Sequence, residues 1–419
     1  MSKFIIEGGK HLKGEVEIKG MKNAITPIIA ATLLTDETCI IDNVPKISDV
    51  DKMIDILKSL SSEISWTGDQ QLTICNKNIS LKTLDQKAVK SLRSSILFLG
   101  PLLARFGKVD LPEPGGCIIG KRPIDVHLSA LKSLGAQIIE DNGFYHLQAD
   151  KLIGSKIILP EFSVTATENI LMAAVKAQGQ TIIKLAAQEP HVQDLCNFLN
   201  KMGAKISGIG THTLIIDGVD KLKGAQYKII PDQIEIGTFI VLAAVTHSEL
   251  HIKNIIPEHL DLILLKLTEI GVKFELKENQ LDIYPSYNLK AFKLQALPYP
   301  GFPTDLQAPF ALLATQCNGV SLIQDPLYES RMSYVGELIK MGANAIVADP
   351  HRIIISGPTP LYGQEIKSFD LRAGATLIIA GLLAEGQTII NQVEIVDRGY
   401  EKIEERLSHL GAEIKRAEN

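Results

Sequence analysis

The hexapeptide Leu131-Lys-Ser-Leu-Gly-Ala136 represents a pattern that recurs through the whole chain. Versions of it occupy residues 57–62, 131–136, 199–204, 267–272, 338–343 and 407–412. In five of the six, a glycine follows the last apolar position of a helical segment. A left-handed residue at that position ends a helix at little steric cost. A run of β-forming residues follows, as at 343–347. The pattern therefore predicts a helix, a glycine stop and a strand in each copy.

A second helix-to-strand signal lies between these copies. Residues 174–183 and 383–390 each pass from an apolar segment through a glycine into Gln-Thr-Ile-Ile. Looser versions surround Thr38, Val109, Leu250 and Ser321. One copy would be no more than a common helix ending, but six copies at near-even spacing are poorly explained by chance. Together the two signals predict six α/β units with a period of roughly 70 residues.

Short hairpins are expected between these helices, and Asp141-Asn-Gly143 has the composition of one such turn. Six units with this mixture do not fit one doubly wound sheet. We therefore expect an α/β (α+β) chain of two domains with three repeats each. The best candidate for the boundary is 229–232, which contains Pro231.

Composition narrows the class of protein and its partners. The 419 residues carry a formal net charge of -5, which argues against a surface that coats nucleic acid. The amino terminus turns polar within a few residues and no apolar run reaches membrane-spanning length. Five cysteines without metal-ligand spacing indicate free thiols. We expect a cytoplasmic protein with no nucleic-acid or membrane partner, no metal and no cofactor.

The segment 111–125 has the most unusual composition, because prolines and glycines surround Cys117. We expect it to be a mobile loop. Lys121 and Arg122 are near enough in sequence to lower the pKa of the thiol, which favours the reactive thiolate. The alternative is that Cys117 is a small buried hydrophobic residue beside two isoleucines.

Five arginines lie beside expected helix starts or turns, where a guanidinium fork suits phosphate or carboxylate. They are Arg93, Arg122, Arg331, Arg372 and Arg398. Each taken alone could equally be a solvated or salt-bridged residue.

Two expected helix starts and one acid complete the candidate set. Lys22 and Asn23 precede an apolar helix, and Ser163 or Thr165 is a natural N-cap for the next apolar run. Such starts offer backbone amides to a diphosphate, although capping alone is the commoner role. Asp305, in a proline-rich segment, is either a general base or another helix cap. Walker, dinucleotide-binding and HExxH motifs are absent.

These motifs occur together in one known family. They are Lys22-Asn-Ala24, Arg93, Gly115-Gly-Cys117, Arg122-Pro-Ile-Asp125, Ser163-Val164, Pro303-Thr-Asp305, Arg331, Asp370-Leu-Arg372 and Asp397-Arg-Gly-Tyr400. With this set the chain resembles, over essentially its whole length, the UDP-N-acetylglucosamine enolpyruvyl transferases, which begin peptidoglycan precursor synthesis. The loop with Cys117 is typical of this branch, since the sister enzymes that act on shikimate 3-phosphate lack it.

The resemblance implies a two-domain inside-out α/β barrel of six repeated units with the active site in the cleft between the domains. One domain would span 22–230, and the other would combine 1–21 with 231–419. The implied substrates are phosphoenolpyruvate and UDP-N-acetylglucosamine, with no cofactor or metal. A monomer or a weak homo-oligomer is expected.

The same resemblance implies roles for individual residues. Cys117 would protonate the enol methylene and Asp305 would accept the proton of the sugar hydroxyl. Lys22, Arg122 and Arg398 would grip phosphoenolpyruvate, and Lys22 and Arg398 are counted with the catalytic residues. The substrate-binding set comprises Lys22, Asn23, Arg93, Arg122, Pro123, Ile124, Asp125, Val126, Ser163, Val164, Thr304, Asp305, Leu327, Arg331, Arg372 and Arg398.

Three positions depart from the family's usual pattern. Thr165 stands where the family commonly has glycine, Gln233 where it has arginine, and Met332-Ser333 where it has Phe-Met. In the implied active-site cleft, these positions lie on the side that would bind the nucleotide sugar more than on the side that would bind phosphoenolpyruvate. Two hypotheses compete with this function. The chain is an enolpyruvyl transferase that acts on a different nucleotide or sugar acceptor, or it is a non-catalytic paralogue that binds UDP-sugars.

Overall fold

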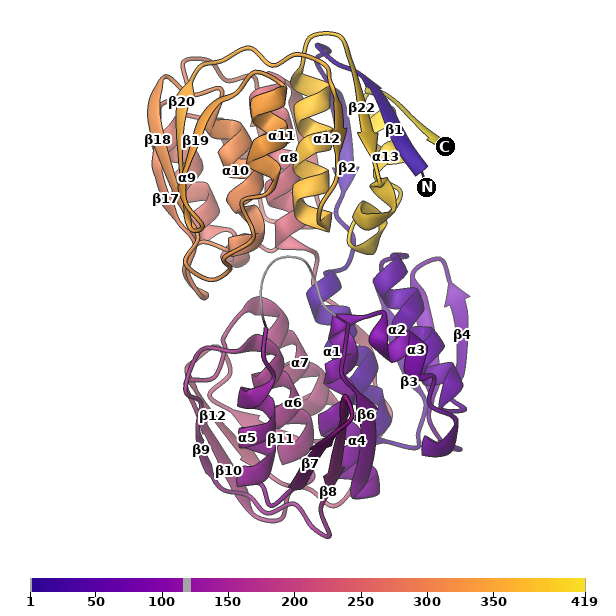
Figure 1. Cartoon of the computed structure of the whole chain (residues 1–419). Helices are drawn as coiled ribbons and strands as arrows, with labels where there is room; N and C mark the ends of the chain where they lie inside the picture. Colours follow the sequence, from indigo (N-terminus) through magenta and orange to yellow (C-terminus); the bar gives the residue numbers. More distant parts are fainter. Residues whose placement is uncertain (1, 116–121, 419) are drawn as a thin grey trace. The chain divides into compact units, whose positions relative to one another are not determined.

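The computed structural model describes residues 2–115 and 122–418, which divide into two compact units. The N unit comprises 20–115 and 122–230, and the C unit comprises 2–19 and 231–418. In each unit, mainly antiparallel sheets surround buried helices (Figure 1). We describe each unit by itself.

The N unit is built around three buried helices, α1 (Lys22–Ala31), α4 (Leu99–Phe106) and α6 (Val164–Ala174). Its other helices are α2 (Ser48–Ser59), α3 (Gln86–Lys90), α5 (Asp125–Ser133) and α7 (Pro190–Lys201). Its strands are β3 (Cys39–Asp42), β4 (Glu63–Gly68), β5 (Gln71–Cys75), β6 (Lys108–Pro112), β7 (Gln137–Asp141), β8 (Phe144–Gln148), β9 (Lys156–Ile158), β10 (Gln180–Lys184), β11 (Lys205–Ser207), β12 (Thr213–Asp217) and β13 (Gln226–Lys228). They form the sheets β13-β3-β5-β4, β6-β8-β7 and β11-β12-β10-β9.

The C unit repeats this plan around α8 (Gln233–Val245), α10 (Gln307–Ala314) and α12 (Leu371–Leu383). Every residue of α8 and α10 is buried, as expected for helices that are apolar on all sides. The outer helices are α9 (Asp261–Ile270), α11 (Tyr334–Lys340) and α13 (Ile403–His409). The strands are β1 (Ser2–Glu7), β2 (Lys13–Glu17), β14 (Glu249–Lys253), β15 (Lys273–Leu276), β16 (Gln280–Tyr284), β17 (Lys293–Gln295), β18 (Gly319–Gln324), β19 (Asn344–Asp349), β20 (Arg352–Gly357), β21 (Glu365–Lys367), β22 (Gln387–Asn391) and β23 (Glu413–Glu418).

The sheets share one topology. The C unit has the orders β15-β16-β14-β2, β17-β18-β20-β19 and β21-β22-β1-β23. In all five four-stranded sheets of the described chain, one edge strand runs parallel to its neighbour and the other pairs are antiparallel. The strand β1, near the amino terminus, lies between β22 and β23 and pairs with both. One structural motif is therefore used repeatedly.

The predicted helix and strand are present in all six copies, and the glycine stop is present in five of them. The helices α2, α5, α7, α9, α11 and α13 end in the repeated pattern, and β4, β7, β11, β15, β19 and β23 follow them. The glycines of the five copies have φ angles between 94° and 112°, the left-handed region where a side chain is strained. In the first copy Ser61 adopts φ 73° instead. The strands predicted from the second signal are also present, as β3, β6, β10, β14, β18 and β22.

The hairpin prediction is confirmed, while the loop prediction needs correction at its ends. Asn142 and Gly143 join β7 to β8 with φ angles of 49° and 74°, as a type I′ turn requires. The expected loop 111–125 begins inside β6 and ends at the first residue of α5. Pro112 is tolerated in β6 because it is the last residue of an edge strand.

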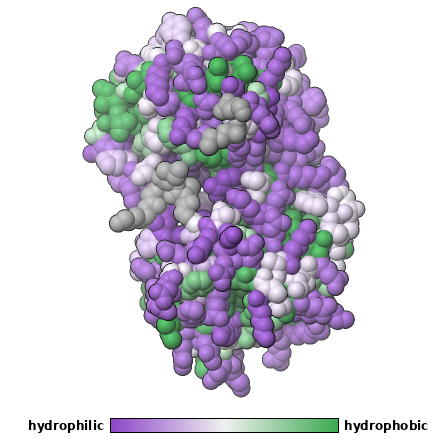
Figure 2. All heavy atoms as spheres, turned by 45° about the vertical axis from the view of Figure 1, so that its right-hand side comes forward, coloured by the Kyte–Doolittle hydropathy of each residue, from purple (hydrophilic) through white to green (hydrophobic). Residues whose placement is uncertain are grey.

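The surface is that of a chain with its apolar residues inside. On the face drawn in Figure 2, polar side chains cover most of the surface and apolar ones form separate patches. Over the residues that the structure describes, no helix is long and apolar enough to span a membrane. The α/β fold class expected from the repeats is confirmed.

Candidate active site

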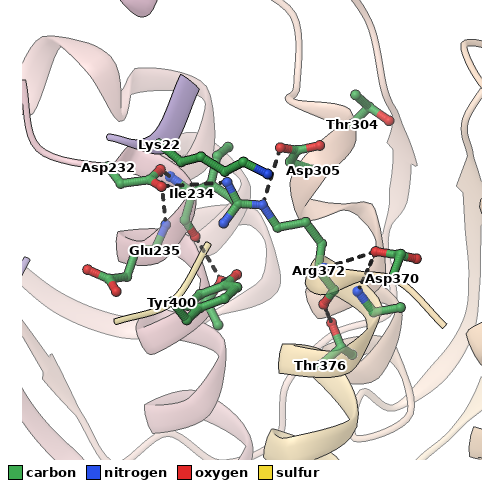
Figure 3. A network of polar contacts seen from close by, with 12 residues as sticks. Lys22, Asp232, Ile234, Glu235, Thr304, Asp305, Asp370, Arg372, Thr376 and Tyr400 are labelled. Carbon is green, nitrogen blue, oxygen red and sulfur yellow. Dashed lines mark hydrogen bonds and ion pairs between the residues drawn. The ribbon is translucent and has the colours of Figure 1, made fainter. Parts of the chain in front are cut away.

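A cluster of charged side chains surrounds Asp305 in the C unit. Asp305 lies in a short 3-10 helix, Thr304–Leu306, and its Oδ1 accepts a hydrogen bond from Nη2 of Arg331. Its Oδ2 accepts from Nε of Arg372 at 3.3 Å. Figure 3 shows the guanidinium of Arg372 directed toward both Asp305 and Asp232. Both carboxylate oxygens of Asp305 therefore accept from arginine side chains.

Both arginines of this cluster are buried, and the neighbouring acids keep them charged. Burial lowers the pKa of Arg331, but the charges of Asp305 and Asp370 outweigh burial and raise the pKa overall. The pKa of Arg372 is raised in the same way, because Tyr400, Asp232 and Asp305 outweigh the burial effect. Two permanent cations therefore face one carboxylate in a region of low polarity.

The start of α12 places Arg372 in the cluster. Asp370 is the N-cap and its Oδ1 accepts from the backbone N–H groups of Arg372 and Ala373, at 2.9 and 3.0 Å. The guanidinium then lies over the ring of Tyr400, with its carbon 5.2 Å from the ring centroid, and Nη2 is 3.5 Å from Asp232 Oδ2. Among the described residues, neither Nη atom of Arg372 has a hydrogen-bond partner. An anion could accept from these nitrogens.

Further expected residues of the C unit join the cluster or flank it. Thr304 accepts from Nη1 of Arg331 at 2.8 Å and donates to Asp325. Oδ1 of Asp325 in turn accepts from the backbone N–H of Leu327 at 3.0 Å. Arg398 is the last residue of the 3-10 helix Val393–Arg398. The structure thus brings Thr304, Asp305, Arg331 and Arg372 together, with Leu327 attached through Asp325.

In the N unit, Lys22 and Asn23 are the first two residues of α1. The ammonium of Lys22 lies 2.8 Å from Oδ2 of Asp49, which is almost fully buried in the first turn of α2. Sequence reasoning missed Asp49, because an acid in the first turn of a helix is an ordinary feature. Its burial and its cationic partner become visible only in the folded chain.

A second group of expected residues gathers at the start of α5. Arg93 begins the 3-10 helix Arg93–Phe98, and its Nη2 donates to the backbone oxygen of Arg122. Pro123 and Ile124 follow, and Asp125 and Val126 are the first residues of α5. No side chain caps this helix start. Arg93 therefore holds the segment that leads into an uncapped helix.

The start of α6 corrects one expectation. Ser163 occupies the N-cap position, but its side chain makes no capping hydrogen bond, and Thr165 is the second residue inside the helix. The backbone oxygen of Ser163 accepts from the hydroxyl and the N–H of Thr167, at 2.8 and 3.0 Å. Within the part of the chain that the structure describes, no side chain at the N-cap accepts from the N–H groups of the first turn, which begins at Val164.

A buried histidine that sequence reasoning missed joins these two helix starts. His127, on α5, is 2% exposed, and its Nε2 lies 3.1 Å from the hydroxyl of Thr165 on α6. Its Nδ1 lies 3.0 Å from Nδ2 of Asn169. Burial and the charge of Arg93 lower the pKa of His127 to about 3. In the sequence, a single histidine within a helix does not indicate that it will form hydrogen bonds to a neighbouring helix.

Cys117 lies outside the described residues, as does Lys121. The described cysteines, Cys39, Cys75, Cys196 and Cys317, form no disulfide, and burial raises the pKa of three of them, Cys39 to about 11 and Cys196 and Cys317 to about 12. Within 2–115 and 122–418, no three His, Cys, Asp or Glu side chains form a group that could hold a metal ion.

The chain matches known proteins over nearly its whole length. Residues 6–407 match the family described as EPSP synthase (3-phosphoshikimate 1-carboxyvinyltransferase). A UDP-N-acetylglucosamine 1-carboxyvinyltransferase of Koribacter versatilis is 45% identical and covers 99% of this chain and 96% of its own length. A relative from Clostridium tetani, named UDP-N-acetylglucosamine 1-carboxyvinyltransferase 2, is 46% identical over 99% of this chain and 100% of its own.

Solved structures agree on the fold. The enolpyruvyl transferase NikO from Streptomyces tendae superposes with a TM-score of 0.91 at 24% identity, covering 99% of both chains. EPSP synthase from Acinetobacter baumannii gives a TM-score of 0.76 at 20% identity over 100% of both chains. The repeated α/β plan is therefore the enolpyruvyl transferase fold. The chain belongs to the EPSP synthase family and, within it, to the UDP-N-acetylglucosamine 1-carboxyvinyltransferases.

Proposed function

We propose that this enzyme transfers the enolpyruvyl group of phosphoenolpyruvate to the 3'-hydroxyl of UDP-N-acetylglucosamine and releases phosphate. The observation that carries the proposal is 45% identity, over 99% of the chain, to a relative named for this transfer. The product would begin the synthesis of peptidoglycan precursors in the cytoplasm.

The proposed reaction is an addition followed by an elimination. The carboxylate of Asp305 takes the proton of the sugar hydroxyl while that oxygen forms a bond to C2 of phosphoenolpyruvate. Cys117 supplies a proton to the C3 methylene, and a tetrahedral ketal results. C3 then returns a proton to the thiolate of Cys117, the bond from C2 to the phosphate oxygen breaks, the departing phosphate takes up the proton held by Asp305, and the enol double bond forms again. No redox step occurs, so side chains alone can supply the proton transfers.

The charges of the C unit support this assignment of Asp305. Asp305 is 23% exposed in its side chain, while Arg331 and Arg372 are 6% and 3% exposed. A ligand can therefore approach the carboxylate more easily than the two arginines that orient it. Fixed cations that require little reorganisation also stabilise the negative charge that develops during addition.

We assign the remaining residues by their chemistry. Lys22, Arg122 and Arg398 grip the phosphate and carboxylate of phosphoenolpyruvate, with support from Arg93, Arg331 and Arg372. A second set holds the nucleotide sugar. It comprises Asn23, residues 122–126, Ser163, Val164, Thr304 and Leu327. The uncapped starts of α5 and α6 support this second assignment, because free backbone N–H groups bind diphosphate oxygens.

Phosphate release from phosphoenolpyruvate tests the proposal. Release should require UDP-N-acetylglucosamine, and UDP, UMP and shikimate 3-phosphate should not replace it. Mass spectrometry of the product should show the acceptor with one added enolpyruvyl group. Faster release with shikimate 3-phosphate, or binding of UDP-N-acetylglucosamine without any turnover, would contradict the proposed reaction.

A further inference from the structure

The C unit has a surface pocket that lies outside the cluster around Asp305. The pocket has a volume of about 390 Å³ and is bordered by α11, the edge strand β21 and the end of β22. Its polar lining consists of Glu337, Lys340, Glu365, Lys367, Asn391 and Gln392. The volume falls within the range of small-molecule pockets, about 300–1,000 Å³. Two of the lining side chains are acidic and two are basic, so the pocket suits a ligand that carries both charges.

Glu337 is the most buried acid of this lining. Its side chain is 7% exposed, and its Oε1 accepts from the ammonium of Lys340 at 2.7 Å. Its Oε2 accepts from the backbone N–H of Lys367 at 3.4 Å. The side chain of Lys340 is 59% exposed, and an ion pair with so exposed a partner contributes little to stability. Another cation can therefore replace Lys340 at Glu337 at small cost.

The other two repeats of the C unit have a cation at the position of Glu337. Glu337 directly precedes the first leucine of the repeated pattern, as Lys266 does in α9 and Arg406 does in α13. Nζ of Lys266 donates to the backbone oxygen of Lys293, in the edge strand β17, at 3.0 Å. Nη2 of Arg406 donates to the backbone oxygen of Glu17, in the edge strand β2, at 3.0 Å. In both repeats a long basic side chain therefore spans from the helix to the edge strand.

Each of these two cations also has a carboxylate partner. Lys266 pairs with Glu269 at 2.6 Å, and Arg406 pairs with Glu235. In the repeat of α11 an acid stands where the cation stands elsewhere, and the pocket lies between that acid and β21. The pocket thus takes the place that the side chain of Lys266 or Arg406 takes in the equivalent repeats. A ligand with an ammonium or guanidinium group would restore the same contacts.

The basic side chains of the pocket suit the other end of such a ligand. The ammonium of Lys367 lies 5.9 Å from the centroid of the Phe369 ring, and Lys340 becomes available when a ligand cation takes its place. Nδ2 of Asn391 donates to Oε1 of Glu365 at 2.9 Å, which holds this second carboxylate beside the end of β22. A carboxylate on the ligand, joined to its cation by a short aliphatic chain, matches this arrangement.

We propose that this pocket binds a basic amino acid, with its side-chain cation between Glu337 and Glu365 and its carboxylate toward Lys340 and Lys367. The site is separate from the one proposed for enolpyruvyl transfer, because none of its lining residues belongs to the expected substrate-binding set. The inference therefore does not depend on the proposed reaction.

Calorimetry with the unmodified enzyme tests the class of ligand. L-arginine and L-lysine, the two probes, should bind. L-citrulline has the size of arginine but an uncharged urea group, so it should bind at least about 10-fold more weakly, the effect of one charge-assisted hydrogen bond. Agmatine, which keeps the guanidinium but lacks the carboxylate, should also bind more weakly than arginine. Equal affinities for arginine and citrulline, or no binding of either basic amino acid at millimolar concentration, overturn the proposal.

Variants of Glu337 test the place of binding. Glu337→Gln keeps the shape of the side chain but removes its charge, and it should weaken L-arginine binding about 10-fold. Glu337→Lys supplies the cation that Lys266 supplies in α9, so it should abolish binding. Glu269→Gln changes an acid of the equivalent helix outside the pocket, and this control should bind L-arginine as the starting enzyme does. If one Glu337 variant fails to fold, the other and the comparison of ligands still decide the matter.

Asp305→Asn separates this pocket from the candidate active site, whose acid also attracts cations. Its affinity for L-arginine should equal that of the starting enzyme. Loss of binding in Asp305→Asn together with normal binding in Glu337→Gln would locate the ligand at the active site and overturn the proposal. Because calorimetry needs no turnover, this result is independent of whether enolpyruvyl transfer is observed.

Discussion

Two helix starts of the C unit and three of the N unit are completed in different ways. In the C unit, Asp232 and Asp370 cap α8 and α12 with side-chain hydrogen bonds to the first N–H groups. In the N unit, α1, α5 and α6 begin at Met21, Ile124 and Ser163 with no side-chain cap. The capping side chains of α8 and α12 satisfy N–H groups of the first turn, whereas no side chain does so at the starts of α1, α5 and α6.

The polar side chains differ in the same sense. The C unit packs buried arginines against carboxylates, as at Asp305, while the bridge of the N unit is a chain of neutral hydrogen bonds from Asn169 through His127 to Thr165. One repeated fold therefore holds an ionic cluster around Asp305 and a neutral chain of hydrogen bonds between α5 and α6.

The largest effect is expected from Asp305→Asn. Asparagine keeps the shape and one acceptor but cannot take up a proton at neutral pH. Loss of a general base lowers turnover by about 10² to 10⁴, while affinity for UDP-N-acetylglucosamine, measured by calorimetry, should change little. Asp349→Asn, at an exposed turn with Arg352, is the control and should keep full turnover. Near-normal turnover in Asp305→Asn would show that the C unit supplies no base.

A smaller effect is expected from Arg372→Met, which leaves Asp232 buried without its cation. Removing one partner of a buried pair costs about 3–5 kcal/mol of stability, so the urea midpoint should fall clearly. The matched control is Lys253→Met, which breaks the exposed pair with Glu15 and should cost less than about 1 kcal/mol. Equal midpoints for the two variants would contradict the idea that the C unit depends on its ionic cluster.

The neutral bridge of the N unit should respond to acid. The pKa of His127 is about 3 in the folded chain, against an ordinary value of 6.5. Between these pH values, His127 binds a proton in the unfolded chain but not in the folded chain. Protonation therefore favours unfolding, and the stability that the neutral side chain of His127 contributes is lost as pH falls below 6.5. The slope is at most about 1.4 kcal/mol per pH unit.

His127→Gln tests this slope, because glutamine does not titrate. Burial raises the pKa of Asp194 to about 6, which works in the opposite direction, so only the difference between the two proteins is informative. The free energy of unfolding of both proteins is measured by urea titration at pH 6, 5 and 4. The difference in favour of the starting enzyme should shrink as pH falls, by at most about 1.4 kcal/mol per pH unit. A difference that stays constant with pH would mean that His127 is protonated in the folded chain.

The smallest effect concerns the caps themselves. Asp370→Ala removes two capping hydrogen bonds and should cost about 1 kcal/mol. Ser163→Ala removes no capping bond, so the free energy of unfolding should change by less than about 0.5 kcal/mol. Denaturant titration of both variants measures the contrast. A cost for Ser163→Ala equal to that of Asp370→Ala would remove the distinction between the two kinds of helix start.

Most of the secondary structure of the repeats could be predicted because its signals are local. A glycine such as Gly135 ends a helix through its own backbone freedom, and the turn at Asn142 and Gly143 depends on two adjacent residues. Ser61 shows the limit of this reasoning. It takes the same left-handed conformation without being glycine, because the surrounding fold imposes it.

The sequence by itself determined the six repeats, the α/β class and a list of candidate residues, since periodicity and helix stops act over a few residues. Only the tertiary structure decided which candidates meet. Arg372 reaches Asp305 across 67 positions and His127 reaches Asn169 across 42. It also decided that Ser163 leaves α6 uncapped while Asp370 caps α12. Such pairings depend on which helices pack together and on burial, where the low dielectric strengthens each contact and makes an unpaired polar group costly.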